Sequence, residues 1–264
     1  MSELYEQQTS QASAEETQTA ELVEPMSISD KFVGIFSEPG ATFINIRQSG
    51  PRVSDWLVPL LALTVILLAG TLIRFSNPEF MADIMQKQQE AMQQQVESGK
   101  ITQEQADQFS EQMGSMGGLQ KIFSAIGVMI GVPIVFFLVA LVYWLLVRFV
   151  MRGDISFTML LSVYGLTAYI SIVDQLLSIL LGYALNNFYA TLSPAAFLTP
   201  DLASPVYKLL SNLNPLSIWA YFLFALGLHH AGYLSKAKAF GLVFGLWILW
   251  VLGSAFISLP FMGG

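Results

Sequence analysis

The sequence predicts an all-α integral membrane protein, a bundle of five transmembrane helices with an inserted helical hairpin. Composition supports this class. The chain of 264 residues is 54% hydrophobic, and its 12% share of charged residues is about half that of soluble domains. Mean hydropathy is +0.56. Arrangement supports it too, because the apolar residues gather in long uncharged runs that suit membrane spans.

Residues 1–27 are expected to form a disordered acidic tail. The first 24 residues hold six glutamates and no lysine or arginine, and such a segment cannot bury enough apolar surface to fold. The tail lacks the basic start and short apolar core of a cleaved signal peptide, so the first apolar run should remain in the protein as a span.

Residues 28–54 follow another pattern, in which apolar side chains alternate loosely with polar ones on both sides of Pro39-Gly40. This pattern favours two short amphipathic helices lying at the membrane surface over an apolar linker.

Five apolar runs approach the roughly 20 residues that a helix needs to cross the hydrocarbon core. They cover residues 56–73, 122–147, 155–173, 216–228 and 239–259. The first span is therefore placed at 55–75, and the other four within 121–262. The fourth run is short and needs flanking residues to complete a span. A sixth span over 176–198 is disfavoured, because two asparagines and a proline interrupt it.

Residues 76–120 predict a helical hairpin between the first two spans. Asn77 and Pro78 are typical of a helix start, and Gly99 is typical of a helix end. Thr102 then begins a second helix. Each helix has one apolar stripe and a glutamine-rich remainder. The stripes serve either packing of the two helices on each other or binding of a partner, and the sequence leaves both open.

The basic residues favour a cytoplasmic N-terminus and an external C-terminus. With five spans, seven of the twelve lysines and arginines fall on the side of the N-terminus. These seven are Lys31, Arg47, Arg52, Arg148, Arg152, Lys236 and Lys238. The same orientation places the hairpin outside.

Asp174, together with Gln175, is the candidate polar site within the membrane. A charged group in a span is costly and usually faces the bundle interior or a water-filled cavity. One interpretation is a proton or cation relay. The other, which the sequence favours, is a hydrogen bond between helices or a place at the outer interface, with residues 176–181 returning along the membrane. Asp174 lies about 30 Å along a helix that begins at Ile155, which is roughly the hydrocarbon thickness.

Five residues within the spans are candidates for helix packing: the glycines have the spacing for close helix approach, and the proline should kink the second span. They are Gly127, Gly131, Pro133, Gly241 and Gly245. His229 and His230 close the fourth span. They lack the further ligands that a metal site needs, which favours a role at the cytoplasmic interface.

The sequence contains no recognisable catalytic set: no nucleophile paired with a base, no phosphate-binding loop and no paired carboxylates. It also has no cysteine, which excludes disulfides and thiolate metal sites. We therefore expect no enzymatic activity, no cofactor and no metal. Nucleic-acid binding is not expected either, because the net charge is −7.

Three stretches of the chain, in the setting of five spans, resemble the Yip family of Ypt/Rab-interacting proteins in its prokaryotic branch. They are "IFSEPGATFINIR" before the first span, "VYGLTAYISIVDQLLSIL" in the third, and "NPLSIWAYFLFALGLHHAGYLSKAKAFGLVFGLWILW" near the C-terminus. The resemblance covers roughly residues 30–260 and implies five spans with a cytosolic N-terminus. Eukaryotic members act in traffic between endoplasmic reticulum and Golgi and bind prenylated Rab GTPases. This sequence lacks their Asp-Leu-Tyr-Gly-Pro motif, so the Rab role is not carried over.

The function expected from these features is a scaffold or adaptor in a prokaryotic plasma membrane. It would contact the lipid bilayer, further copies of itself, and protein partners through residues 28–54 and 76–120. The alternative is a small transporter or channel built around Asp174, and the single charge within the spans favours the scaffold.

Overall fold

The computed structural model describes residues 23–115, 117–185, 190–199 and 204–256, and every regular element within these ranges is a helix. The first described helices are α2 (Ile28–Ser37) and α3 (Pro39–Ser49). A reciprocal capping box between Ser27 and Asp30 begins α2, and Pro39 begins α3 at its first position. The proline therefore divides the amphipathic segment into two helices.

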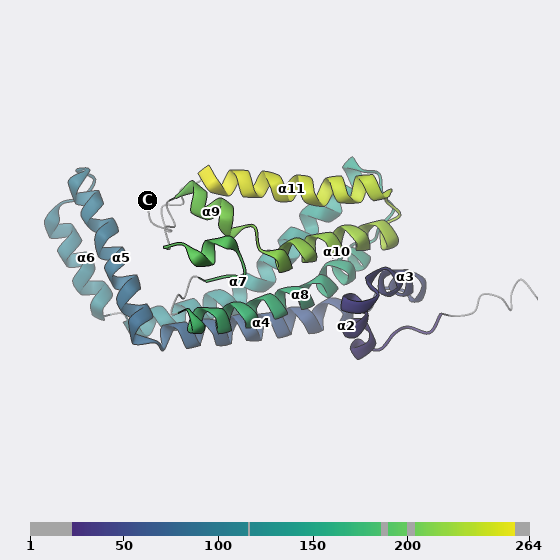
Figure 1. Ribbon diagram of the computed structural model, residues 1–264, viewed down its shortest axis with the longest axis horizontal. Helices are drawn as coiled ribbons and strands as arrows, with labels where there is room; N and C mark the ends of the chain where they lie inside the picture. Colours follow the sequence, from purple (N-terminus) through teal and green to yellow (C-terminus); the bar gives the residue numbers. More distant parts are fainter. Residues whose placement is uncertain (1–22, 116, 186–189, 200–203, 257–264) are drawn as a thin grey trace, which may run out of the picture.

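A hairpin of two helices, α5 (Pro78–Glu97) and α6 (Gln103–Ser115), follows the first span, α4 (Ser54–Phe75). Its start is fixed by the side chain of Asn77, whose Oδ1 atom accepts hydrogen bonds from two backbone amides of the first turn. Gly99 lies in the turn with a φ of 71°, a conformation that favours glycine. The hairpin stands away from the other helices and contacts α4 and α7 at its base (Figure 1).

Seven further helical elements follow in the described part of the chain. They are α7 (Gly117–Leu145), the π-helical turn η1 (Leu146–Val150), α8 (Phe157–Ala184), the 3-10 turn η2 (Pro194–Phe197), α9 (Pro205–Ser211), α10 (Pro215–Ala231) and α11 (Lys236–Phe256). Among the described helices, α4, α7, α8 and α11 are long and apolar enough to span a membrane. The helices α9 and α10, bent by 59° at a short break, are a further candidate for a span if the two are taken together. The predicted class, an all-α protein with several membrane spans, is confirmed.

Helix α8 lies at the centre of the bundle. It packs beside α4 and α10, while α7 lies beside α4 and α11 beside α10 (Figure 1). Half of the residues in the most apolar 18-residue stretch of α8 are buried, against 22% or less in the corresponding stretches of the other three unbroken candidate spans. The outer helices therefore present apolar side chains outward, as a bundle in lipid requires.

The two amphipathic helices pack into the same core, at the end of the bundle opposite the hairpin (Figure 1). Ile35, Phe43 and Ile46 are fully buried there. Gly227 on α10 permits this approach, because a Cβ atom at that position would lie 2.4 Å from Val163 and 2.9 Å from the ring of Phe43. The segment is thus docked on the bundle as well as amphipathic.

Candidate functional site

Asp174 lies on the central helix α8 and is only 8% exposed. Its carboxylate accepts two hydrogen bonds from the start of α10. The Nδ2 atom of Asn214 donates to one oxygen at 2.8 Å, and the hydroxyl of Ser217 donates to the other at 3.4 Å. Asp174 therefore ties α8 to the break between α9 and α10.

Both polar atoms of the Asn214 side-chain amide form hydrogen bonds. Its Oδ1 atom accepts from the backbone amides of Leu216 and Ser217, which begins α10. Its Nδ2 atom is then directed to Asp174. A break in a membrane helix leaves backbone groups without intrahelical partners, and this amide satisfies part of them.

Helix α8 continues through Asp174 to Ala184 as one element. The expectation that residues 176–181 return along the membrane is therefore wrong. Leucines and isoleucines fill this stretch, and no proline interrupts it, so the helix continues. Gln175, the other member of the predicted polar site, is half-buried beside Asp174.

The chemistry open to this cluster is hydrogen bonding between helices. The two donors to Asp174 are a neutral amide and a neutral hydroxyl from one helix turn. Within the described ranges, no group of three or more histidines, cysteines and carboxylates is placed to hold a metal ion. A relay role for Asp174 stays a hypothesis.

The glycines predicted to serve helix packing face open space as far as the described residues extend. A Cβ atom added at Gly127, Gly131, Gly241 or Gly245 would meet no heavy atom within 4 Å. Their packing role stays a prediction. Pro133 lies inside α7, which continues as one helix on both sides of it.

Close helix contact occurs instead at Gly165, which sequence spacing did not single out. A Cβ atom there would lie 2.3 Å from the Cα atom of Trp56 and 2.9 Å from the backbone oxygen of Asp55. Helices α4 and α8 therefore meet backbone to backbone at this point, close to the start of α4.

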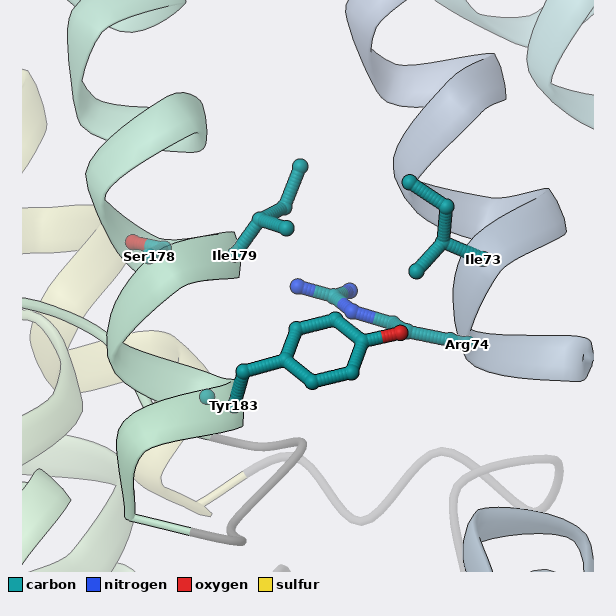
Figure 2. Close-up of a pocket in the computed structure, with 6 residues that line it drawn as sticks. Ile73, Arg74, Ser178, Ile179 and Tyr183 are labelled. Carbon is teal, nitrogen blue, oxygen red and sulfur yellow. The ribbon is translucent and has the colours of Figure 1, made fainter. Parts of the chain in front are cut away.

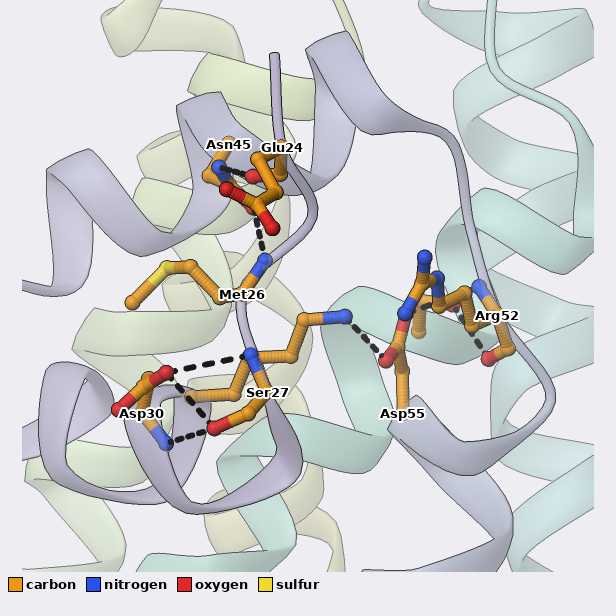
Figure 3. A network of polar contacts seen from close by, with 9 residues as sticks. Glu24, Met26, Ser27, Asp30, Asn45, Arg52 and Asp55 are labelled. Atoms are coloured by element: carbon orange, nitrogen blue, oxygen red, sulfur yellow. Dashed lines mark hydrogen bonds and ion pairs between the residues drawn. The ribbon is translucent and has the colours of Figure 1, made fainter.

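A buried ion pair lies at the same end of the bundle, and sequence analysis did not predict it. The Nζ atom of Lys31 is 2.6 Å from Oδ1 of Asp55, with 3% and 1% of the two side chains exposed. The second carboxylate oxygen accepts from the backbone amide of Arg52 (Figure 3). One signal was available, because Lys31 lies one helical turn from the core residue Ile35 on α2.

The histidine pair lies beside α3. The guanidinium of Arg47 donates to the backbone oxygen of His230 at 3.2 Å and stacks 3.7 Å from the ring centre of Tyr233. The Nδ1 atom of His229 contacts the backbone oxygen of Leu234 at 2.7 Å. These contacts fix the turn after α10 against the amphipathic segment.

Comparison with known families decides the identity of this bundle. The family model of the Yip1 domain matches residues 33–257. This chain belongs to the Yip1 domain family. The Yip1 domain thus includes the hairpin, every candidate span and the contact between Asp174 and Asn214, and it begins two residues after Lys31.

A bacterial relative supports the same assignment of the Yip1 domain. "Membrane protein YknW" of Bacillus subtilis (strain 168) is 26% identical over 230 residues, which cover 85% of this chain and 90% of the relative. No solved structure matches. The resemblance to a prokaryotic Yip protein is confirmed, and the protein is an integral membrane protein.

Proposed function

We propose that this Yip1 domain protein is a non-enzymatic membrane scaffold or adaptor, with the hairpin of α5 and α6 as its main surface for protein partners. The observation that carries the proposal is the position of this hairpin. It contacts the bundle at its base and stands away from it over the rest of its length (Figure 1).

The hairpin combines a fixed base with single exposed apolar side chains farther along. At the base, the rings of Phe75 and Phe80 meet edge to face with centres 6.0 Å apart. Farther along, Met85 is 47% exposed and Phe109 is 53% exposed, although both helices are otherwise polar. Side chains of this size can bury apolar area against a protein partner.

The opposite end of the molecule offers a second surface, for the lipid bilayer. Helix α2 buries Ile35 but exposes Phe32, Val33 and Phe36 by 42%, 59% and 40%. Apolar groups on a docked amphipathic helix suit insertion at the headgroup boundary. The distribution of lysine and arginine supports an orientation with this end in the cytoplasm and the hairpin outside.

A photo-crosslinking experiment in intact membranes tests the proposal. A photoreactive residue replaces Phe109, and a matched one replaces Val65, which is 63% exposed on the apolar first span. We expect a discrete protein adduct from position 109 and lipid adducts alone from position 65. If position 109 gives no protein adduct and the purified protein does not self-associate, the scaffold proposal fails.

A small transporter is the second candidate, favoured by one observation: Asp174 on the unbroken helix α8 contacts the break between α9 and α10. Broken membrane helices line many transporter sites. This candidate predicts a proton or cation flux in liposomes that Asp174→Asn abolishes. A wild-type protein without flux, or an unchanged flux in the variant, would exclude it.

A further inference from the structure

A basic face lies at the end of the bundle that carries α2 and α3. It is made by the end of α3, the turn after η1 and the turn after α10 together with the start of α11. Five exposed side chains form it: Arg47, Arg148, Arg152, Lys236 and Lys238. Among the described carboxylates, Asp154 alone pairs with this face, through Arg148 at 2.7 Å. The other four cations have no carboxylate partner in the described part of the chain.

The segments that carry these cations form one surface, because they contact each other. The Nζ atom of Lys238 donates to the backbone oxygen of Met151 at 3.2 Å. A Cβ atom at Gly153 would lie 2.9 Å from the side chain of Leu234. Arg47 joins the two turns from α3 through its contacts with the turn after α10. The positive charges of the basic face are therefore held together on folded segments.

Basic residues toward the opposite end of the molecule are arranged differently. The side chain of Arg74 lies between α4 and α8, beside Tyr183 (Figure 2). The Nζ atom of Lys121 donates to the hydroxyl of Ser76 at 2.9 Å. Lys100 is exposed, but it lies in the turn of the hairpin, away from these two. A surface of several exposed cations is thus found at the end with α2 and α3.

The acidic tail joins the bundle beside this face. Its first 22 residues lie outside the described chain and contain five glutamates but no lysine or arginine. The chain that follows them is fixed to α3 by Asn45, which donates to the backbone oxygen of Glu24 and accepts from the amide of Met26, both at 3.1 Å (Figure 3). Asn45 is two residues from Arg47 on the same helix, whose diameter is about 10 Å. The tail is therefore tethered close to the basic face.

The tether strengthens an attraction that would be weak between separate molecules. A single exposed ion pair contributes little to binding, so several pairs are needed. A flexible chain of this length has a root-mean-square end-to-end distance of about 25 Å, which is enough to pass around α3. A ligand linked in this way has an effective concentration on the order of millimolar.

We propose that the first 22 residues of the acidic tail bind the basic face of the same molecule. Their glutamates pair with the four cations that have no carboxylate partner in the described chain, and the tail covers the face against other anionic ligands. Anionic lipid headgroups carry the same charge, but they are not tethered beside Arg47. The tail lies outside the matched Yip1 domain, residues 33–257, whereas the basic face lies within it. The tail therefore adds control of this face to the domain.

The test is a binding titration of the full-length protein, in an uncharged detergent, with a fluorescent peptide of residues 1–24. Fluorescence anisotropy gives the dissociation constant of the peptide. In the tail variant, glutamine replaces five glutamates, which keeps the length of the tail and removes its charge. They are Glu3, Glu6, Glu15, Glu16 and Glu21. The tail variant is also combined with Lys236→Gln on the basic face or with Lys100→Gln, the matched control in the hairpin turn.

We expect the peptide to bind the tail variant roughly tenfold or more tightly than the wild type, because the wild-type tail already occupies the face. Lys236→Gln should weaken binding of the peptide to the tail variant severalfold, and Lys100→Gln should leave it unchanged. Salt at about 1 M, which shortens the screening length to about 3 Å, should abolish binding. The glutamine substitutions lie outside the described bundle, so the test does not depend on a change in its core.

Three results would overturn the proposal. If the peptide binds the wild type and the tail variant equally, or binds neither, the tail does not occupy the face. If short-chain phosphatidylglycerol binds the tail variant and the peptide does not, the ligand of the face is an anionic lipid. If dilution makes the wild type bind the peptide as tightly as the tail variant does, the tail comes from a second copy, because competition within one molecule does not depend on protein concentration.

Discussion

The Nζ atom of Lys31 on α2 lies 2.6 Å from the Oδ1 atom of Asp55 on α4, and both side chains are almost fully buried. The pair joins the N-terminal amphipathic helices to the first span, where Asp55 also holds the backbone of Arg52 (Figure 3). A buried ion pair stabilises the fold only while both partners are present. If one partner is removed, the other remains buried as an uncompensated charge, which is strongly destabilising.

Lys31→Met should therefore detach α2 and lower the free energy of unfolding by about 3–5 kcal/mol. The measurement is unfolding in detergent, together with thiol labelling of Ile35→Cys, which is buried while α2 is docked. Lys238→Met is the control, since Lys238 is exposed. The double variant Lys31→Met/Asp55→Leu should regain part of the loss. A cysteine at position 35 that stays protected in Lys31→Met would contradict the role of the pair.

Asn214→Asp tests whether the amide of Asn214 holds Asp174. An aspartate can still begin α10, but it brings a carboxylate to the position now 2.8 Å from Asp174. We expect a loss of about 1–3 kcal/mol in unfolding free energy, because a donor becomes an acceptor. Asn77→Asp is the matched control: Asn77 also precedes a proline and begins a helix, but no carboxylate of the described residues bonds to its side chain. Equal effects of the two substitutions would exclude the contact as a stabilising one.

Local features of the fold were predictable because they depend on neighbours in sequence. Asn77 before Pro78 predicts the start of α5, and the structure has that start. The same pair of residue types, Asn214 and Pro215, begins α10. The same rule, applied to this pair in the sequence, predicts a helix start before the fourth apolar run, where the structure has the break between α9 and α10.

The contacts of the candidate site were not predictable, because they join residues far apart in sequence. Asp174 and Asn214 are separated by 40 residues, and Lys31 and Asp55 by 24. Spacing shows that Gly127 and Gly131 share a helix face, but it cannot show which helix meets that face. In the structure α4 packs against Gly165 instead. This glycine has no second glycine four residues away, so the spacing rule does not select it.

Gly165→Ala should destabilise the bundle, whereas Gly127→Ala should not. The added methyl group at 165 would collide with backbone atoms of α4, and overpacking of this kind costs about 1–3 kcal/mol. At 127 the methyl group meets open space, and replacing a helical glycine gains about 0.5–1 kcal/mol. Thermal unfolding of the two variants in one detergent gives the comparison. If Gly127→Ala instead weakens cross-linking between two copies, the predicted packing role of that glycine lies in self-association.

The orientation of the bundle can be measured directly, because the chain has no cysteine. Single cysteines replace Gln94 in the hairpin, Ser235 in the turn after α10, and Gln175 beside Asp174. Gln94 and Ser235 are exposed, so each should react with a membrane-impermeant thiol reagent, Gln94→Cys from outside and Ser235→Cys only in opened cells. Gln175→Cys should stay protected on both sides, since α8 continues about 14 Å beyond it to Ala184. If Gln175→Cys is labelled as fast as Gln94→Cys, Asp174 lies at the surface instead. If Gln175→Cys is labelled through a water-filled path, and Asp174→Asn changes the rate of that labelling, the transport function is favoured.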